Sequence, residues 1–354
     1  MTTLTAARLT SQQLGGPLAR RPEDVVTRLL AVQGQDPRGA RLAVRSRSSG
    51  LTAADVDAAL TQRRSLLITW LNRGTLHLVT AEDYWWLHPL TTPQLATGNR
   101  RRLARLGVSP AQTEVGVQVV ADAVATDGQQ TRGCLRERLQ ADGVPTEGQA
   151  LVHVLMAASL AGLVVRGPVV DGEHAYVAVR DWLGDPPAPL DRDEALSRLA
   201  RRYLTGHGPA NDRDLARWAG IPLGAARLGL DLIAGELVRD DDGLVDLAGR
   251  EPASALPPPR LLGAFEPLLL GWVSRDVVVG AHHEVATSNG LFRPVALVGG
   301  RVVATWALGG GVVSLTPLES ISRAVLAALR DDARDVLRFL GLPQTPLVVV
   351  PAFD

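Results

Sequence analysis

The segment Thr131-Arg-Gly-Cys-Leu-Arg-Glu-Arg-Leu139 begins with a threonine suited to cap the first turn of a helix. After a turn, an amphipathic helix is expected over Gly148 to Ala161, and strand-like runs follow over Val164 to Val179. Asp171-Gly172 divides these runs and is typical of a two-residue hairpin turn. Helix, turn, helix and hairpin in this order predict a winged-helix unit.

The same pattern occurs on both sides of this unit. Downstream, a short helix, a longer helix and a short hairpin are expected in turn: Asn211 to Trp218, Leu223 to Leu237 and Val238 to Leu247. Upstream the copy is looser, with a short helix followed by two strands: Thr52 to Leu60, Leu66 to Trp70 and Thr75 to Val79. The chain therefore reads as three tandem units of one kind.

The last third of the chain changes to strands. Pro-rich joins precede and follow the third unit at Asp185 to Pro189 and Leu256 to Pro259. Beyond them, Gly299-Gly300 joins two strands, and one long helix is expected over Pro317 to Leu340. The sequence predicts an α+β fold of three winged-helix units and a C-terminal β-barrel-like domain, either a small barrel or a curled sheet with one helix. The boundaries are 1–109, 110–186, 187–258 and 259–354.

Composition excludes several chemistries. The chain has 354 residues, and all 37 of its basic residues are arginine. Without lysine there is no P-loop lysine, no kinase-type lysine and no Schiff-base lysine. Cys134 is the only cysteine, and His282-His283-Glu284 would place adjacent histidines on opposite faces of a strand. We expect no metal and no cofactor.

Charge is distributed unevenly although the net charge is zero. Residues 1–110 hold 15 arginines against 7 acidic residues, so the rest of the chain is acidic. A basic first third gives mild support for a polyanion partner such as DNA, and chance segregation of charge is the alternative. The start of the chain lacks a signal-peptide pattern, and the apolar run from Leu151 to Val165 is too short to span a bilayer. We expect a cytoplasmic monomer without a membrane partner.

The most unusual element is Gln33-Gly-Gln-Asp-Pro37. A helix is expected over Pro22 to Val32, and Pro37 forces the residues before it out of helical geometry. Two glutamines two positions apart in extended chain project to the same side. Two interpretations are open: polar residues that cap the end of a helix, or a pair of amides that act together.

The sequence resembles the AlkZ/YcaQ-type winged-helix DNA glycosylases over nearly its whole length. The resemblance rests on motifs spread along the chain: Leu29 to Pro37, Thr69 to Val79, Tyr203 to Ala210, Asp214 to Trp218, Leu261 to Glu266, Leu269 to Trp272, Arg275, Asn289 to Pro294 and Gly300 to Trp306. In this family the catalytic motif is Gln, a usually aliphatic residue, then Gln or Asp. It falls on Gln33 and Gln35, with Gly34 between them, and Glu266 stands where an Asp is expected.

The resemblance implies a monofunctional DNA glycosylase that removes N7-alkylated, bulky or crosslinked purines from duplex DNA, for repair or self-resistance to a genotoxin. A purine alkylated at N7 is already a cationic leaving group, so the enzyme mainly positions water and stabilises the sugar cation. Amides suit this task because each carries both a donor and an acceptor. Asp36 is either a carboxylate helper or a residue that stops the helix.

Several further residues are candidates for contacts with DNA. The arginines of the basic first third lead the set: Arg38, Arg41, Arg45 and Arg73. For Arg73 and His77 a structural ion pair is the alternative, and for Asn289 and Arg293 it is a structural turn. A non-catalytic DNA-binding regulator is the competing function, and a protein that sequesters a genotoxin is a third. The mostly apolar helix Leu223 to Leu237 disfavours sequence-specific readout.

The absence of lysine generates a prediction about the product. On an alkylated duplex we expect an intact abasic strand, which breaks only on later treatment with alkali or heat, because no side-chain amine can form a Schiff base. Borohydride should trap no covalent complex between protein and DNA. The control is protein whose N-terminal amine is blocked, because that amine could form a Schiff base in place of a lysine. Efficient trapping by the blocked protein would show lyase chemistry and refute this expectation.

Overall fold

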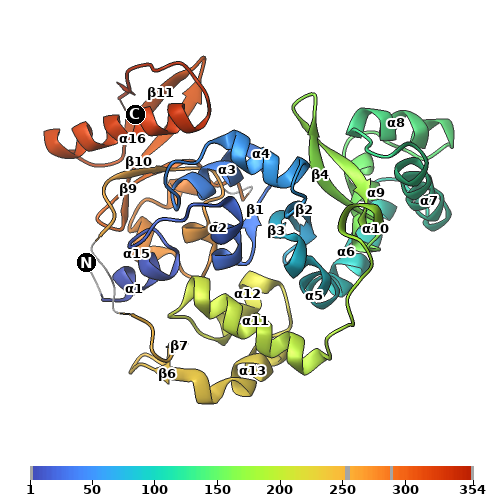
Figure 1. Cartoon of the computed structure of the whole chain (residues 1–354), viewed down its shortest axis with the longest axis horizontal. Helices are drawn as coiled ribbons and strands as arrows, with labels where there is room; N and C mark the ends of the chain where they lie inside the picture. Colours follow the sequence, from blue (N-terminus) through green and yellow to red (C-terminus); the bar gives the residue numbers. More distant parts are fainter. Residues whose placement is uncertain (1–2, 252–255, 288–289, 352–354) are drawn as a thin grey trace.

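The computed structural model describes residues 3–251, 256–287 and 290–351. Two five-stranded sheets and one short hairpin are surrounded by helices. The first sheet has the order β1-β3-β2-β4-β5, with these strands: Val32–Gln33, Leu66–Leu71, Thr75–Thr80, Val164–Val170 and Glu173–Ala178 for β1 to β5. Strands from the first and second expected units therefore share one sheet. Figure 1 shows β1 to β3 in the middle of the molecule.

The helices of the first two units follow the sequence pattern closely. The first part of the chain contains Thr3–Ser11, Pro22–Leu29, Pro37–Arg45, Ala53–Thr61, Ala81–Thr91 and Pro93–Arg105 as α1 to α6. The second contains Pro110–Asp127, Arg132–Ala141, Ala150–Leu160 and Val179–Leu183 as α7 to α10. Thr131 caps α8. The β4–β5 hairpin turns at Asp171 and Gly172, and these two residues have positive φ. In Figure 1, α7 and α8 lie at one end of the molecule.

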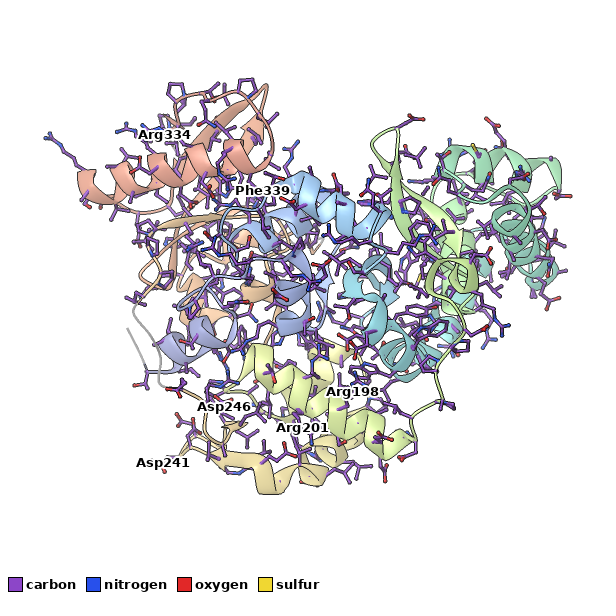
Figure 2. All side chains as sticks on the ribbon, in the orientation of Figure 1. Arg198, Arg201, Asp241, Asp246, Arg334 and Phe339 are labelled. Atoms are coloured by element: carbon purple, nitrogen blue, oxygen red, sulfur yellow. The ribbon has the colours of Figure 1, made fainter. Side chains whose placement is uncertain are left out.

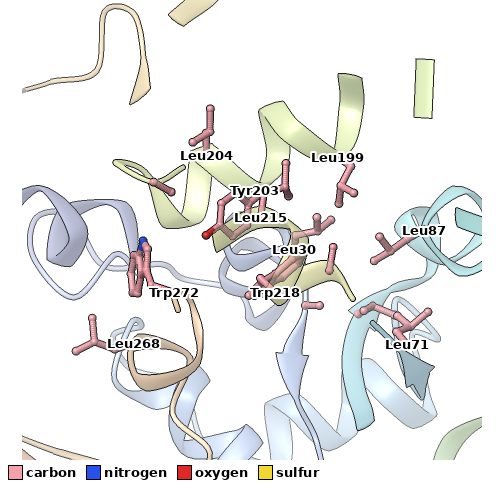
Figure 3. Packing of buried hydrophobic residues seen from close by; sticks show 14 of the residues in the cluster. Leu30, Leu71, Leu87, Leu199, Tyr203, Leu204, Leu215, Trp218, Leu268 and Trp272 are labelled. Carbon is pink, nitrogen blue, oxygen red and sulfur yellow. The ribbon is translucent and has the colours of Figure 1, made fainter. Parts of the chain in front are cut away.

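The third expected unit also has helices followed by a hairpin. It contains Arg192–His207, Asp212–Ala219 and Leu223–Leu232 as α11 to α13, then the strands Leu237–Arg239 and Val245–Leu247 as β6 and β7. The last helix stops five residues earlier than expected because a 3-10 turn, Ala234–Glu236, intervenes. Figure 3 shows how α11 and α12 pack onto the centre of the molecule through Tyr203 and Trp218, which lie close to Leu30, and Leu71 belongs to the same buried cluster.

The C-terminal sheet is open. Its order is β12-β11-β10-β9-β8, with β8 to β12 at Arg260–Leu262, Val295–Val298, Arg301–Gly309, Val312–Pro317 and Val348–Val349. The expected barrel-like closure is not seen, because the two short edge strands, β8 and β12, lie at opposite ends of the sheet. Short helices Pro267–Leu270 (α14) and Asp276–Val279 (α15) lie between β8 and β9.

One long helix covers this sheet. It runs over Arg323–Phe339 as α16 and starts later than expected, because β11 continues to Pro317 and Ser322 caps the helix. Phe339 is buried in the core shared with the sheet, whereas Arg334 lies on the outer side of the helix, as Figure 2 shows. Within the described ranges, no helix is both long enough and apolar enough to cross a membrane.

A fully buried ion pair joins three distant parts of the chain. The Arg47 guanidinium donates to Glu266, and neither side chain is exposed to solvent (0% each). Its remaining donors bond the Gln12 backbone oxygen after α1 at 2.7 Å, the Gln12 side-chain oxygen at 3.0 Å, and the backbone of Ala43 in α3 at 3.0 Å. Because a buried charge without its partner is costly, this pair holds α1, α3 and the Leu261 to Glu266 segment in one arrangement.

We expect Glu266→Gln to destabilise the protein by about 3–5 kcal/mol, because it leaves the Arg47 charge buried and uncompensated. Urea unfolding followed by circular dichroism measures the change. Asp127→Asn is the matched control: it breaks the Arg138–Asp127 pair, whose side chains are 44% and 42% exposed, and should change stability little. Equal, small effects of the two substitutions would contradict the role assigned to the buried pair.

Candidate active site

Gln33 lies on an edge strand of the first sheet, not at the end of a helix. Helix α2 ends at Leu29, and Leu30 adopts a positive φ of 64°, which turns the chain into β1. Gln33 pairs with His77 of β3 in antiparallel register, and the Gly34 amide donates to the Leu76 carbonyl at 2.7 Å. The expected helix to Val32 is therefore wrong in its last turn, because pairing with β3 satisfies the backbone there.

The two glutamines form a hydrogen-bonded pair. The Gln33 Nε2 donates to the Gln35 Oε1 at 2.5 Å. Gln33 is buried, with 6% of its surface exposed, and Gln35 is exposed to solvent. The pair thus joins the buried sheet to the surface, and of the two interpretations of this motif the one with two adjacent amides fits the geometry.

Asp36 and Pro37 end the extended segment and start the next helix. The Asp36 Oδ1 accepts from the Arg38 amide at 2.9 Å and from the Gly39 amide at 3.0 Å, and Pro37 occupies the first turn of α3. Asp36 is therefore the N-cap of α3. The capping bonds favour the interpretation of Asp36 as the residue that starts the next helix.

Gly34 leaves room for a side chain. A Cβ at this position would lie 3.5 Å from the Leu78 nitrogen and 3.6 Å from the Ile68 Cγ2, which are ordinary van der Waals contacts. Gly34 is also outside the positive-φ region. Neither its backbone conformation nor its surroundings requires glycine. Glycine in place of an aliphatic residue therefore makes the backbone between the two glutamines less rigid, and it does not prevent them from meeting.

Arg73 contacts the pair from the turn between β2 and β3. Its Nη2 donates to the Gln33 Oε1 at 3.4 Å, and its Nη1 donates to the Trp218 carbonyl at 3.2 Å. Burial lowers the pKa of the Arg73 guanidinium, and the positive charges of Arg217 and Arg275 lower it further. The arginines near Arg73 therefore add positive charge on this side of the amide pair.

His77 lies beside Gln33 and is neutral. It is buried, its Nδ1 lies 2.9 Å from the Thr75 carbonyl, and the neighbouring strand places Thr69 on its other side. Burial lowers the pKa of His77 to about 3, and the charge of Arg73 adds to this shift. At neutral pH His77 therefore has no proton to give as an acid, and its burial makes it part of the support behind Gln33 rather than a surface that DNA reaches.

The arginines expected to contact DNA divide into two groups. Arg41 pairs with Asp57, and Arg45 donates to Asp332 at 2.8 Å and to Asp335 at 3.0 Å. We assign these two a structural role, because their guanidinium groups already bind carboxylates. Arg38 and Arg293 are exposed and form no ion pair within the described ranges. Asn289 lies outside the described residues.

Sequence reasoning assigned no role to Arg217 or Arg275. Arg217 is an exposed residue of α12, and Arg275 lies 5.0 Å from the Phe292 ring centroid. Both stood within the motifs that carry the family resemblance, which was the available signal. His282, also considered at the sequence level, lies 3.5 Å from Glu319, and nowhere in the described ranges do three or more histidine, cysteine or acidic side chains gather as metal ligands would.

Comparisons with known proteins agree on one family. The family model described as DNA glycosylase AlkZ-like matches residues 26–339. An interstrand DNA cross-link repair glycosylase from Streptomyces sahachiroi is 29% identical over 359 residues, which is 92% of this chain and 93% of the relative. The solved structure of the DNA glycosylase AlkZ from Streptomyces sahachiroi superposes with a TM-score of 0.78 at 25% identity and covers 98% of each chain.

The buried histidines give a prediction for stability. Burial is the main cause that lowers the pKa of His77, His174 and His207 to about 3 each, whereas in the unfolded chain a histidine titrates near pH 6.5. Below about pH 6.5 the unfolded state binds more protons, so stability falls as the pH falls toward 3.

We expect His77→Gln to reduce this pH dependence by roughly one proton, measured as the slope of unfolding free energy between about pH 6 and pH 4. The exposed His283 provides the matched control, and His283→Gln should keep the wild-type slope. A wild-type slope in His77→Gln would mean that His77 is protonated in the folded protein, against the environment described above.

Proposed function

The chain belongs to the AlkZ-like DNA glycosylase family, and on this premise we propose that it hydrolyses the N-glycosidic bond of N7-alkylated purines in duplex DNA. The observation that carries the proposal is the hydrogen-bonded pair of neutral amides, Gln33 and Gln35, in contact with the Arg73 guanidinium. The proposal includes bulky and crosslinked adducts, because the Streptomyces relative is named an interstrand cross-link repair glycosylase.

The amide pair suits a reaction that needs little acid catalysis. Alkylation at N7 places a positive charge on the purine, so the bond from C1′ to N9 breaks with its electrons moving onto the base, which leaves neutral. The sugar becomes an oxocarbenium-like cation, and water attacks C1′ and releases a proton to solvent. The Gln35 Oε1 keeps a second lone pair beside the bond it accepts from Gln33 and accepts a hydrogen bond from this water, and the Gln35 N–H groups help to orient it.

An unmodified purine lacks this advantage. Its departure needs a proton donor, and the groups beside the pair supply none: His77 is neutral with a pKa of about 3, and Asp36 caps a helix. The proposal therefore limits cleavage to damaged bases that are already cationic. Repair of alkylated DNA and self-resistance to a DNA-alkylating compound both fit such a limit, and the proposal includes both.

Binding to DNA is assigned to exposed arginines around the site. Arg38 at the start of α3 and Arg293 near β9 are proposed to contact backbone phosphates, with Arg217 added from the structure. Such contacts position the duplex without reading its sequence. Affinity should therefore depend steeply on salt and little on sequence, which separates this function from that of a sequence-specific regulator.

The test is release of base from a duplex that carries one N7-alkylguanine, under single-turnover conditions. Gln33→Ala and Gln35→Ala should each lower the rate by about tenfold or more, because each removes a group that orients water in a preorganised site. Melting temperature should stay close to wild type.

Gln118→Ala is the matched control, because Gln118 is an exposed glutamine that bonds Asp122 on its own helix, α7. It should leave the rate unchanged. Full activity of the Gln33→Ala/Gln35→Ala double variant would remove the glutamines from the mechanism. Absence of base release by the wild type, together with tight binding to one undamaged sequence, would favour the regulator.

A further inference from the structure

Arg73 determines which way the Gln33 amide faces. Its guanidinium has five N–H donors and no acceptor, so the group that faces its Nη2 at 3.4 Å must be the Gln33 oxygen. The Gln33 Nε2 then faces the Gln35 oxygen at 2.5 Å. The Gln35 Nε2, at the exposed end of this chain of hydrogen bonds, is left as a donor on the side open to solvent.

Arg73 is itself held by the end of helix α12. Its Nη1 donates to the carbonyls of Trp218 at 3.2 Å and Arg217 at 3.5 Å, in the last turn of that helix. Trp218 is buried in the cluster of Figure 3, so its carbonyl has a fixed position. A carbonyl at a helix C-terminus attracts a cation, which adds to the hydrogen bonds.

The turn that carries Arg73 is also fixed. Gly220, directly after α12, has a φ of 67°, and a Cβ on it would lie 2.4 Å from the Asn72 oxygen and 3.0 Å from the Arg73 nitrogen. Only glycine can occupy a position this close to another backbone segment. The β2–β3 turn therefore packs directly against the end of α12. Two backbone segments far apart in sequence thus place one guanidinium against one amide.

The partners of Arg73 differ from those of its buried neighbours in the same third of the chain. Arg45 and Arg47 bind carboxylates, whereas Arg73 forms no ion pair with any residue that the structure describes. Its donors go to two backbone carbonyls and one amide oxygen. A half-buried guanidinium that bonds an amide oxygen stabilises the fold less than one in an ion pair would, which points to a role of Arg73 at the site.

We propose that Arg73 is a positioning residue that fixes the orientation of the Gln33 amide and, through it, that of Gln35. This inference rests on the proposed function of the glutamine pair. Lysine at position 73 would keep the charge, but a single ammonium group cannot reproduce the planar fork that joins the Trp218 carbonyl to Gln33. Without that fork the Gln33 amide is free to rotate. The amide donors and acceptors that face water then no longer have a fixed orientation.

The experiment compares Arg73→Lys with wild type by single-turnover base release from the N7-alkylguanine duplex. We expect a rate about tenfold or more lower at saturating protein, with the salt dependence of binding unchanged. In a Gln33→Ala background Arg73→Lys should cause no further loss, because Arg73 acts through Gln33. Arg28→Lys is the matched control: Arg28 also donates to a backbone carbonyl, that of Ser11 at 2.9 Å, and should keep the wild-type rate.

Two outcomes would overturn the proposal. One is an equal loss of rate in the wild-type and Gln33→Ala backgrounds, which would make Arg73 an independent contributor. The other is a full rate with a log–log salt slope lower by about 1, which would make Arg73 a phosphate contact.

A second measurement does not depend on activity. The side-chain amide resonances of both Gln33 and Gln35 should shift in nitrogen–proton spectra of Arg73→Lys and stay in place in Arg28→Lys. Unchanged Gln35 resonances would refute the proposal even if the variant failed to support catalysis. If the wild type released no base but the resonances shifted, the proposed function would fail and the positioning role would stand.

Discussion

The buried Arg47–Glu266 ion pair is the constraint on which the position of the site depends. Arg47 follows α3, and Glu266 ends the Leu261 to Glu266 segment of the C-terminal part of the chain. The two segments also meet where a Cβ on Gly39 would lie 2.4 Å from the Ala264 oxygen. Since α3 begins at Pro37, directly after the glutamine motif, a helix anchored in this way fixes where Gln35 leaves the sheet.

The other side of the motif is anchored by the sheet and by the third unit. Gln33 pairs with His77 on β3, and Arg73 joins it to the end of α12. The amide pair therefore lies where the first sheet, the C-terminal segment and the third unit converge. A site assembled from neutral groups needs this rigidity, because weak donors and acceptors contribute to catalysis only when their geometry is fixed in advance.

The local elements could be predicted from the sequence because their signals are local. Thr131 caps α8, and Asp171-Gly172 turns the β4–β5 hairpin, as expected. The approach of the two glutamines was one of two interpretations that their spacing left open, and the catalytic role that the family resemblance implies for them remains a prediction. The expected closure of the C-terminal strands into a barrel-like domain was wrong, because local strand patterns do not determine whether the edges of a sheet meet. The four domain boundaries remain a prediction.

The binding partners of the arginine side chains were the least predictable feature. The arginine excess of the first third suggested a surface for DNA, but Arg45 and Arg47 bind Asp332 and Glu266, more than two hundred residues away. Counting charges along a chain cannot reveal such partners. The reverse holds for Arg73, whose importance comes from the absence of a carboxylate beside it in the described structure and from a contact with an amide 40 residues upstream.

Two neutral amides are proposed to promote cleavage of the glycosidic bond only when the base already carries a positive charge. This proposal is tested most directly with two duplexes that differ in one ring atom: one carries 7-methylguanine, which is cationic, and the other its neutral isostere 7-methyl-7-deazaguanine. We expect equal affinity for the two duplexes and single-turnover release of base from the first alone. Release of the deaza base at a comparable rate would show that the protein supplies a proton to the leaving group and would contradict the account.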